Sequence, residues 1–240
     1  MDFFQQRGYA SINPRWPGES ETVQATRENP DAMANFGVSA ITDVYIKEIQ
    51  KLNEPPIVIG HSFGGLIAQI ILSRGLAVAG VAIDPAPMKG VWQLQLSVLK
   101  ASLPILGNPF NITKAKSLTF DQFKYAFANR LDEKEAKELY DQATIPSPAR
   151  PLFQEGFATF VGNETEVETD NIKRGPLLIT GSEKDNIAPP IFGKASAGKY
   201  NKEVVTEFKL FSNRGHSLAS DHGWKEIAEY VLVWLKKNGF

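Results

Sequence analysis

The segment GHSFGG, residues 60–65, holds the side chain with the clearest chemical potential, Ser62. It matches the pattern G-x-S-x-G, in which a serine occupies a sharp turn between a strand and a helix. The apolar run 57–59 before the turn and the helical apolar pattern 64–73 after it satisfy that context. Such a turn strains the serine backbone and presents its hydroxyl as a nucleophile, whereas the alternative is a glycine-rich turn with an incidental serine.

A serine hydroxyl is a poor nucleophile unless a base takes its proton, and the chain has three histidines. His216 lies in the loop NRGHSL, directly after a predicted strand, and loops at the carboxyl ends of parallel strands share one edge of a sheet. His61 is part of the turn itself and is expected to point away from the neighbouring hydroxyl. His222 is interpreted as a polar residue at the approach to the last helix. We therefore predict that His216 is the base.

An imidazole base needs a carboxylate that fixes its tautomer and balances its charge. Asp185 lies in the loop GSEKDNIAPP, which follows the predicted strand 177–180. Glu183 in the same loop is an alternative. Asp84 is another, because it follows the predicted strand 78–83 and its side chain could also reach the active edge.

The elements that must position these residues alternate between strands and helices. Strands are predicted at 9–12, 57–59, 78–83, 177–180 and 204–211, and helices at 2–7, 39–52, 64–73, 187–196 and 224–237. Strands separated by helical patterns favour an α/β protein with a doubly wound, mostly parallel sheet.

Residues 87–160 depart from this alternation because no strand pattern is convincing there. Prolines separate helical pieces predicted at 92–102, 119–128, 134–142 and 151–160. A segment of this length is better explained as a helical lid than as a crossover. We therefore expect a core formed by residues 1–86 and 161–240, with a lid at 87–160. Apolar lid residues that could line a pocket, or else pack within the lid, are Trp92, Leu94, Leu96, Phe110, Phe123 and Phe127.

The composition excludes several classes of function. The chain has 240 residues, a formal net charge of −1 and no cysteine. The net charge gives no attraction to nucleic acid, and the lack of cysteine excludes disulfides and thiol catalysis. No apolar run has the length of a signal peptide or a membrane span. We expect a cytoplasmic protein that acts on a small molecule and needs neither a metal nor a cofactor.

Taken together, GHSFGG, GSEKDNIAPP and NRGHSL resemble the motifs of the α/β-hydrolase superfamily, in particular its esterases and lipases, over nearly all of the chain. The resemblance implies a serine hydrolase that cleaves a carboxylic ester of a small or medium apolar substrate through an acyl-enzyme. Its triad would be Ser62, Asp185 and His216, in the expected chain order, and the backbone N–H of Phe63 would bind the oxyanion. A serine nucleophile argues against epoxide hydrolases and haloalkane dehalogenases, whereas haloperoxidase-like and lyase chemistry stay open.

The N-terminal region departs from the family pattern. Residues 1–18 resemble the end of the family's first helix and its fourth strand, so the first three strands and the second oxyanion loop are not found. We therefore expect an N-terminally truncated α/β-hydrolase fold with impaired activity. The alternative function is a non-catalytic or weakly active relative that binds an apolar ligand or a protein partner. A dinucleotide-binding protein is disfavoured because no G-x-G-x-x-G follows a strand with an acidic residue at the required distance.

Overall fold

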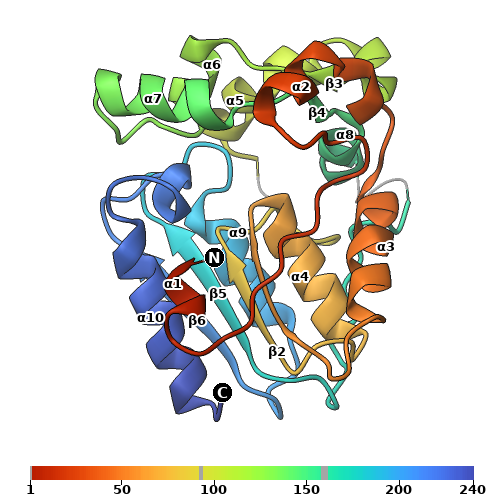
Figure 1. Cartoon of the computed structure of the whole chain (residues 1–240), viewed down its shortest axis with the longest axis vertical. Helices are drawn as coiled ribbons and strands as arrows, with labels where there is room; N and C mark the ends of the chain where they lie inside the picture. Colours follow the sequence, from red (N-terminus) through yellow and green to blue (C-terminus); the bar gives the residue numbers. More distant parts are fainter. Residues whose placement is uncertain (1, 92–93, 158–161) are drawn as a thin grey trace.

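The computed structural model describes residues 2–91, 94–157 and 162–240, and it consists of a parallel sheet between helices with a further helical layer across one end (Figure 1). The four strands of the main sheet lie in the order β1-β2-β5-β6, and each neighbouring pair is parallel. They are β1 (Ile57–His61), β2 (Ala79–Ile83), β5 (Leu177–Ser182) and β6 (Thr206–Phe211). This arrangement confirms the predicted doubly wound, parallel α/β fold.

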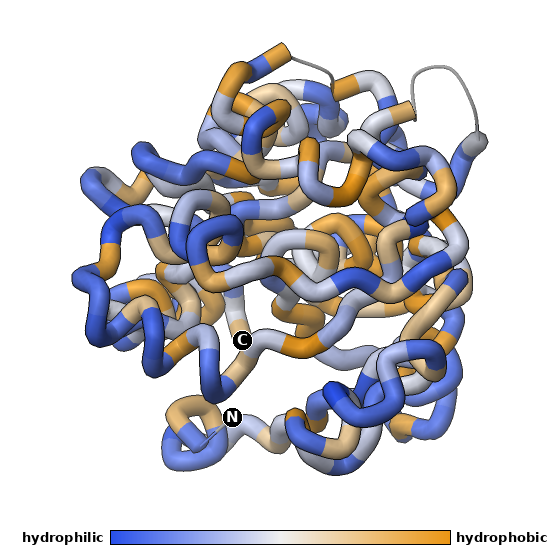
Figure 2. The backbone as a smooth tube through the Cα atoms, turned by 90° about the horizontal axis from the view of Figure 1, so that it is seen from above, coloured by the Kyte–Doolittle hydropathy of each residue, from blue (hydrophilic) through white to orange (hydrophobic). Residues whose placement is uncertain are grey.

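Helices cover both faces of the sheet, which explains why its central strands β2 and β5 are buried throughout. One face packs against α3 (Val38–Ile49), α4 (Phe63–Ser73) and α9 (Pro190–Lys199). The other packs against α10 (Trp224–Lys237) and the short α1 (Asp2–Gln5). Seen from above, hydrophobic segments are concentrated toward the middle and many peripheral loops are hydrophilic (Figure 2).

Successive residues of each central strand contact opposite faces, as the pleat of a strand requires. In β2, Val81 packs on the α10 side and Ala82 on the α4 side. In β5, Leu178 packs on the α10 side and Ile179 on the α4 side. The helix predicted at 224–237 is α10, whose buried residues are Ile227, Val231, Leu232, Trp234 and Leu235.

The helical layer above the sheet comes mainly from the segment between β2 and β5. Its elements are α5 (Leu96–Leu106), η2 (Pro109–Thr113), β3 (Ala115–Lys116), α6 (Phe120–Ala126), α7 (Glu133–Ala143), β4 (Ser147–Pro148) and α8 (Arg150–Phe157). The sequence did not indicate the short antiparallel pair β3–β4. Residues 92, 93 and 158–160, which belong to two predicted helices, lie outside the described residues.

The same layer also receives a contribution from the N-terminal part of the chain. This part forms α2 (Val23–Glu28) and the short η1 (Pro30–Met33). The Arg27 guanidinium donates hydrogen bonds to the carbonyl oxygens of Thr144, Tyr140 and Asp141, which lie at the end of α7 and just after it. Segments more than a hundred residues apart are therefore held together above the sheet.

The predicted strand at Tyr9–Ile12 is wrong. The segment is irregular, and its Tyr9 N–H donates to the Phe4 carbonyl while its hydroxyl donates to the Phe240 carbonyl. Tertiary contacts to the C-terminus thus override a weak strand pattern of four residues. As a result β1 is an edge strand, paired only with β2 in the described part of the chain.

Candidate active site

Ser62 lies between β1 and α4 in a backbone conformation that is unusual for a residue with a side chain. Its φ is 57° and its ψ is −122°. Four backbone hydrogen bonds hold the turn: Ser62 N–H donates to the Ile83 carbonyl, and the Ser62 carbonyl accepts from the N–H groups of Gly65, Leu66 and Ala86. A non-glycine residue in such a region costs on the order of 1–3 kcal/mol, and strain of this kind is concentrated at functional sites.

Gly60 allows this turn to form because the backbone of Gly64 lies directly against it. A Cβ atom at Gly60 would stand 1.9 Å from the Gly64 carbonyl oxygen. We expect Gly60→Ala to lower the free energy of unfolding by about 3 kcal/mol, since backbone rather than a flexible side chain must move. A urea titration of the unfolding transition measures this change.

Gly64→Ala is the matched control, because a Cβ at that position meets nothing within 4 Å. It is expected to leave the unfolding free energy within about 1 kcal/mol of the wild type. Equal losses in both variants would contradict the proposed role of Gly60.

His216 and Asp185 meet at the carboxyl ends of β6 and β5. The Nδ1 atom of His216 lies 2.6 Å from Oδ2 of Asp185, and both side chains are fully buried. The other carboxylate oxygen accepts the N–H groups of Ile187 and Ala188, each at 2.8 Å. The carboxylate is therefore fixed on one side by the backbone and orients the imidazole on the other.

The charges of this pair support each other. Burial opposes ionisation of Asp185, but the His216 imidazole and the hydrogen bonds to its carboxylate lower the pKa of Asp185 below its ordinary value. Burial likewise disfavours the imidazolium, but the Asp185 carboxylate raises the pKa of His216 above its ordinary value. A base with this environment can accept a proton and hold it beside a fixed negative charge.

The far nitrogen of His216 is not engaged by Ser62. Its Nε2 atom is buried and has no hydrogen-bond partner in the part of the chain that the structure describes, so it is not bonded to the Ser62 hydroxyl here. Hydrogen bonds between nucleophile and base are often long without substrate and tighten in the reactive complex. Ser62 and His216 lie at the same edge of the sheet, as the contacts of His61, the residue before Ser62, with the His216 ring and carbonyl oxygen indicate.

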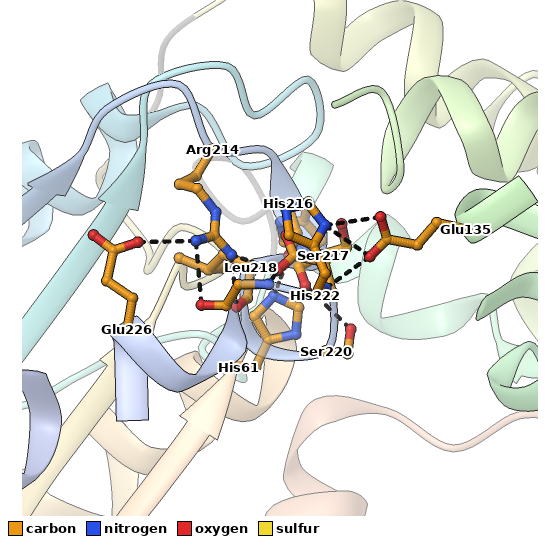
Figure 3. Close-up of polar contacts among 11 residues, drawn as sticks. His61, Glu135, Arg214, His216, Ser217, Leu218, Ser220, His222 and Glu226 are labelled. Atoms are coloured by element: carbon orange, nitrogen blue, oxygen red, sulfur yellow. Dashed lines mark hydrogen bonds and ion pairs between the residues drawn. The ribbon is translucent and has the colours of Figure 1, made fainter. Parts of the chain in front are cut away.

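His61 has a role that the sequence did not indicate. Its ring lies against the ring of His216, with centroids 4.5 Å apart, and its Nε2 lies 2.8 Å from the His216 carbonyl oxygen (Figure 3). Burial lowers the pKa of His61 to about 3, so its ring is neutral and donates this hydrogen bond. His61 thereby joins the turn that carries Ser62 to the loop that carries His216.

Arg214 stabilises the loop that carries His216. Its guanidinium bonds to the carboxylates of Asp221 and Glu226 and to the Leu218 carbonyl (Figure 3). His222, two residues before α10, is exposed and pairs with Glu135 of α7, with an N–O distance of 2.8 Å. His222 is thus a polar residue at the approach to α10, as predicted, and its pairing adds a contact to the helical layer.

The two alternative acids are placed very differently. Glu183 is exposed and accepts the N–H of Asn213. Asp84 is buried, and a carboxylate oxygen of Asp84 lies within 4.8 Å of both a ring nitrogen of His216 and a carboxylate oxygen of Asp185. Burial and the neighbouring Asp185 charge raise the pKa of Asp84 to about 7.

Asp84, Asp185 and His216 offer ligand types that bind divalent cations. However, Asp185 and His216 already bond to each other, and the second oxygen of Asp185 is occupied by two N–H groups. A cation would have to break these bonds. The arrangement fits a hydrogen-bonded acid–base pair better than a metal centre.

A cavity of about 320 Å³ opens at Ser62 beneath the helical layer. Most of its walls are apolar, and they include Trp16, Phe63, Ala101, Ile105, Leu118, Phe123, Phe127, Ile145, Leu152 and Ile187. Of the apolar lid residues singled out in the sequence, Phe123 and Phe127 line it, whereas Leu94, Leu96 and Phe110 are exposed and Trp92 lies outside the described residues. Trp16 was missed because a single aromatic residue in a proline-rich turn has no periodicity to reveal it.

The N-terminus of α4 provides the place for an oxyanion. Phe63 is the first residue of α4, so its N–H has no acceptor within the helix and points along the positive end of the helix dipole. No second donor is evident around Ser62 in the described residues. Along the open edge of β1, a separate cavity of about 310 Å³ shares Trp16, His61 and Gly64 with the first.

Comparison with solved structures gives lipases and other hydrolases of the same fold. The chain superposes on one of the metagenome-derived lipolytic enzymes LipS and LipT with a TM-score of 0.63 and 17% identity, over 98% of this chain and 85% of that one. A monoacylglycerol lipase from Paleococcus ferrophilus superposes with a TM-score of 0.58 and 20% identity, over 86% of this chain and 77% of that one. A meta-cleavage product hydrolase from Pseudomonas fluorescens superposes with a TM-score of 0.54 and 13% identity, over 85% of this chain and 73% of that one.

Structural similarity at such low sequence identity establishes the fold alone, so the reaction has to be argued from the residues of the site. None of the curated proteins matches the sequence significantly. The family comparison is more direct, because residues 1–230 match the alpha/beta hydrolase family. With its parallel sheet, its serine turn after β1 and its acid and histidine loops after β5 and β6, the chain belongs to the alpha/beta hydrolase family.

Proposed function

We propose that the protein is a serine hydrolase that cleaves a carboxylic ester with a small or medium apolar acyl group. The observation that carries the proposal is the strained Ser62, which lines an apolar cavity and whose neighbour His61 contacts the buried Asp185–His216 pair. A pure binding protein has no need for a serine held in a costly conformation at the same sheet edge as an oriented imidazole.

The proposed reaction has two halves. The Ser62 hydroxyl oxygen attacks the ester carbonyl carbon while His216 Nε2 takes its proton, and the Phe63 N–H donates to the oxyanion. When the intermediate collapses, the imidazolium returns the proton to the departing alcohol and an acyl-enzyme remains. Water then attacks this ester, again losing a proton to His216, and the carboxylic acid leaves with Ser62 restored.

The cavity argues for a substrate of limited size. Its volume of about 320 Å³ is at the lower end of the range of small-molecule sites. Each methylene that enters an apolar cavity contributes about 0.8 kcal/mol, which is about fourfold in kcat/KM. We expect kcat/KM for p-nitrophenyl esters to rise from acetate over the next few acyl lengths and then to fall, whereas a flat profile would contradict an acyl site in this cavity.

Two variants of α5 test the assignment of the acyl group to this cavity. Ile105 lines the cavity, whereas Leu103 on the same helix is 65% exposed. Ile105→Trp fills space, so the preferred acyl chain should become shorter by one or more methylenes. Leu103→Trp adds the same side chain on the outer surface and should leave the profile unchanged.

The alternative is a weakly active or non-catalytic relative that binds an apolar ligand. It is favoured by the oxyanion site, for which Phe63 is the one donor identified among the described residues. Loss of one oxyanion donor lowers kcat by about 10²–10³. The serine hydrolase predicts measurable hydrolysis at a rate reduced by this factor, whereas complete absence of turnover in a folded sample would favour the non-catalytic binding protein.

A further inference from the structure

Asp84 is a buried acid that the proposed reaction does not use. It follows β2 with a φ of 41°, and its side chain lies under the catalytic edge of the sheet. The Thr180 hydroxyl donates to Oδ1 at 2.9 Å. The Oδ2 atom is buried and has no hydrogen bond of ordinary geometry in the described part of the chain, although the Ser182 hydroxyl lies close enough to lower the pKa of the carboxyl. Unsatisfied buried carboxylate oxygens are costly, so the position calls for an explanation.

The surroundings of Asp84 contain two other titratable groups that bear on it, Asp185 and His216. One oxygen of Asp84 lies within 4.8 Å of a ligand atom of each. Two carboxylates and one imidazole cannot all be matched in charge, because a single imidazolium balances only one of them. Burial and the neighbouring Asp185 charge therefore raise the pKa of Asp84 to about 7, whereas the pKa of Asp185 is lowered, in the manner of like charges that share a site.

We propose that Asp84 is a second positioning residue for His216, able to replace Asp185 as the carboxylate that orients the imidazole ring. The inference rests on the proposed function only in that His216 is taken as the base. Burial is the main cause of the raised pKa of Asp84, and the Asp185 charge adds to it. Removing the Asp185 charge lowers the pKa of Asp84 and leaves its carboxylate as the negative charge that can balance a His216 imidazolium. Closing its distance to hydrogen-bond length requires a movement of about 2 Å or less, which rotation of an aspartate side chain provides.

A purely structural Asp84 would behave differently. An amide has nearly the shape of a carboxyl group, so Asp84→Asn would then have the same small effect in any background. If Asp84 can replace Asp185, the loss of activity caused by Asp84→Asn depends on whether Asp185 is present. A double-mutant cycle measures this coupling.

The experiment measures kcat/KM against pH for the wild type, Asp84→Asn, Asp185→Asn and the double variant. Asp84→Asn is expected within about threefold of the wild type, Asp185→Asn about 10–100-fold below it, and the double variant about 10⁴-fold below it. The midpoint of the rise of kcat/KM with pH should lie at higher pH in Asp185→Asn than in the double variant. Equal values of kcat/KM and equal midpoints in those two variants would overturn the proposal. Glu183→Gln removes an exposed acid from the same loop and should have no effect.

A second readout separates this inference from the proposed function, because it needs no turnover. The hydrogen-bonded Nδ1 proton of His216 is observed in the downfield proton spectrum of protein labelled with ¹⁵N-histidine. It should persist in Asp185→Asn and disappear in the double variant, and its loss in Asp185→Asn alone would overturn the proposal even if the wild type proves inactive. If Asp185→Asn does not fold, Asp185→Ser, which retains an acceptor for Ile187 and Ala188, replaces it in both experiments.

Discussion

Ser62→Gly should abolish ester hydrolysis and at the same time make the protein more stable. Its kcat is expected to fall by about 10⁴-fold or more, because the nucleophile is removed. Glycine adopts the φ of 57° and ψ of −122° without the steric cost that a Cβ atom brings, so the free energy of unfolding should rise by about 1 kcal/mol. Kinetics with a p-nitrophenyl ester and a urea titration measure the two effects in the same samples.

Ser62→Ala is the control that separates chemistry from strain. It removes the same hydroxyl but keeps the Cβ atom, so activity should be lost without the gain in stability. If Ser62→Gly were less stable than Ser62→Ala, the turn would not be strained at this residue. If either variant kept more than a few per cent of wild-type turnover, Ser62 would not be the nucleophile.

His216→Gln should lower kcat/KM by about 10³–10⁴-fold, the size of effect found when the base of such a constellation is lost. In the wild type, kcat/KM should rise with pH, because the base must be neutral to accept a proton. The Asp185 carboxylate raises the pKa of His216, so the midpoint of this rise should lie above the ordinary histidine value of 6.5. His222→Gln, at the exposed histidine that pairs with Glu135, should change neither the rate nor the profile.

The same pair predicts the pH range in which its contribution to stability is largest. The raised pKa of His216 means that its contribution is complete below pH 6.5 and is lost as pH rises through the raised value. The lowered pKa of Asp185 means that its contribution is complete above the ordinary value of 3.8 and is lost as pH falls through the lowered one. The difference in unfolding free energy between wild type and His216→Gln should therefore be greatest between pH 3.8 and pH 6.5, the two ordinary pKa values.

The parts of the site that the sequence could predict are those that follow directly from a strand. Ser62, Asp185 and His216 each follow a predicted strand within a few residues, and parallel strands bring their carboxyl ends to one edge whatever the details of packing. The same logic placed Asp84 near this edge as an alternative acid. The apolar periodicity of α4 and α10 was equally direct, because each helix has a continuous buried face.

The features that escaped prediction depend on contacts between distant segments. No local pattern brings Trp16 to the cavity, places the ring of His61 against His216 or joins Arg27 to the end of α7. The strand expected at Tyr9–Ile12 rested on the family resemblance and on four residues, and contacts with Phe4 and Phe240 decided its conformation instead. Which of the two nearby acids is paired with His216 likewise depends on distances of a few ångströms in the folded site, which a sequence does not specify.

The central claim, that His216 activates Ser62, is tested most directly by covalent labelling with a fluorophosphonate and mass spectrometry of the peptides. One adduct should form, on the peptide that contains Ser62, and its rate of formation should fall by about 100-fold or more in His216→Gln. A folded wild-type protein that forms no adduct at Ser62, or one whose labelling rate is unchanged by His216→Gln, would contradict the account.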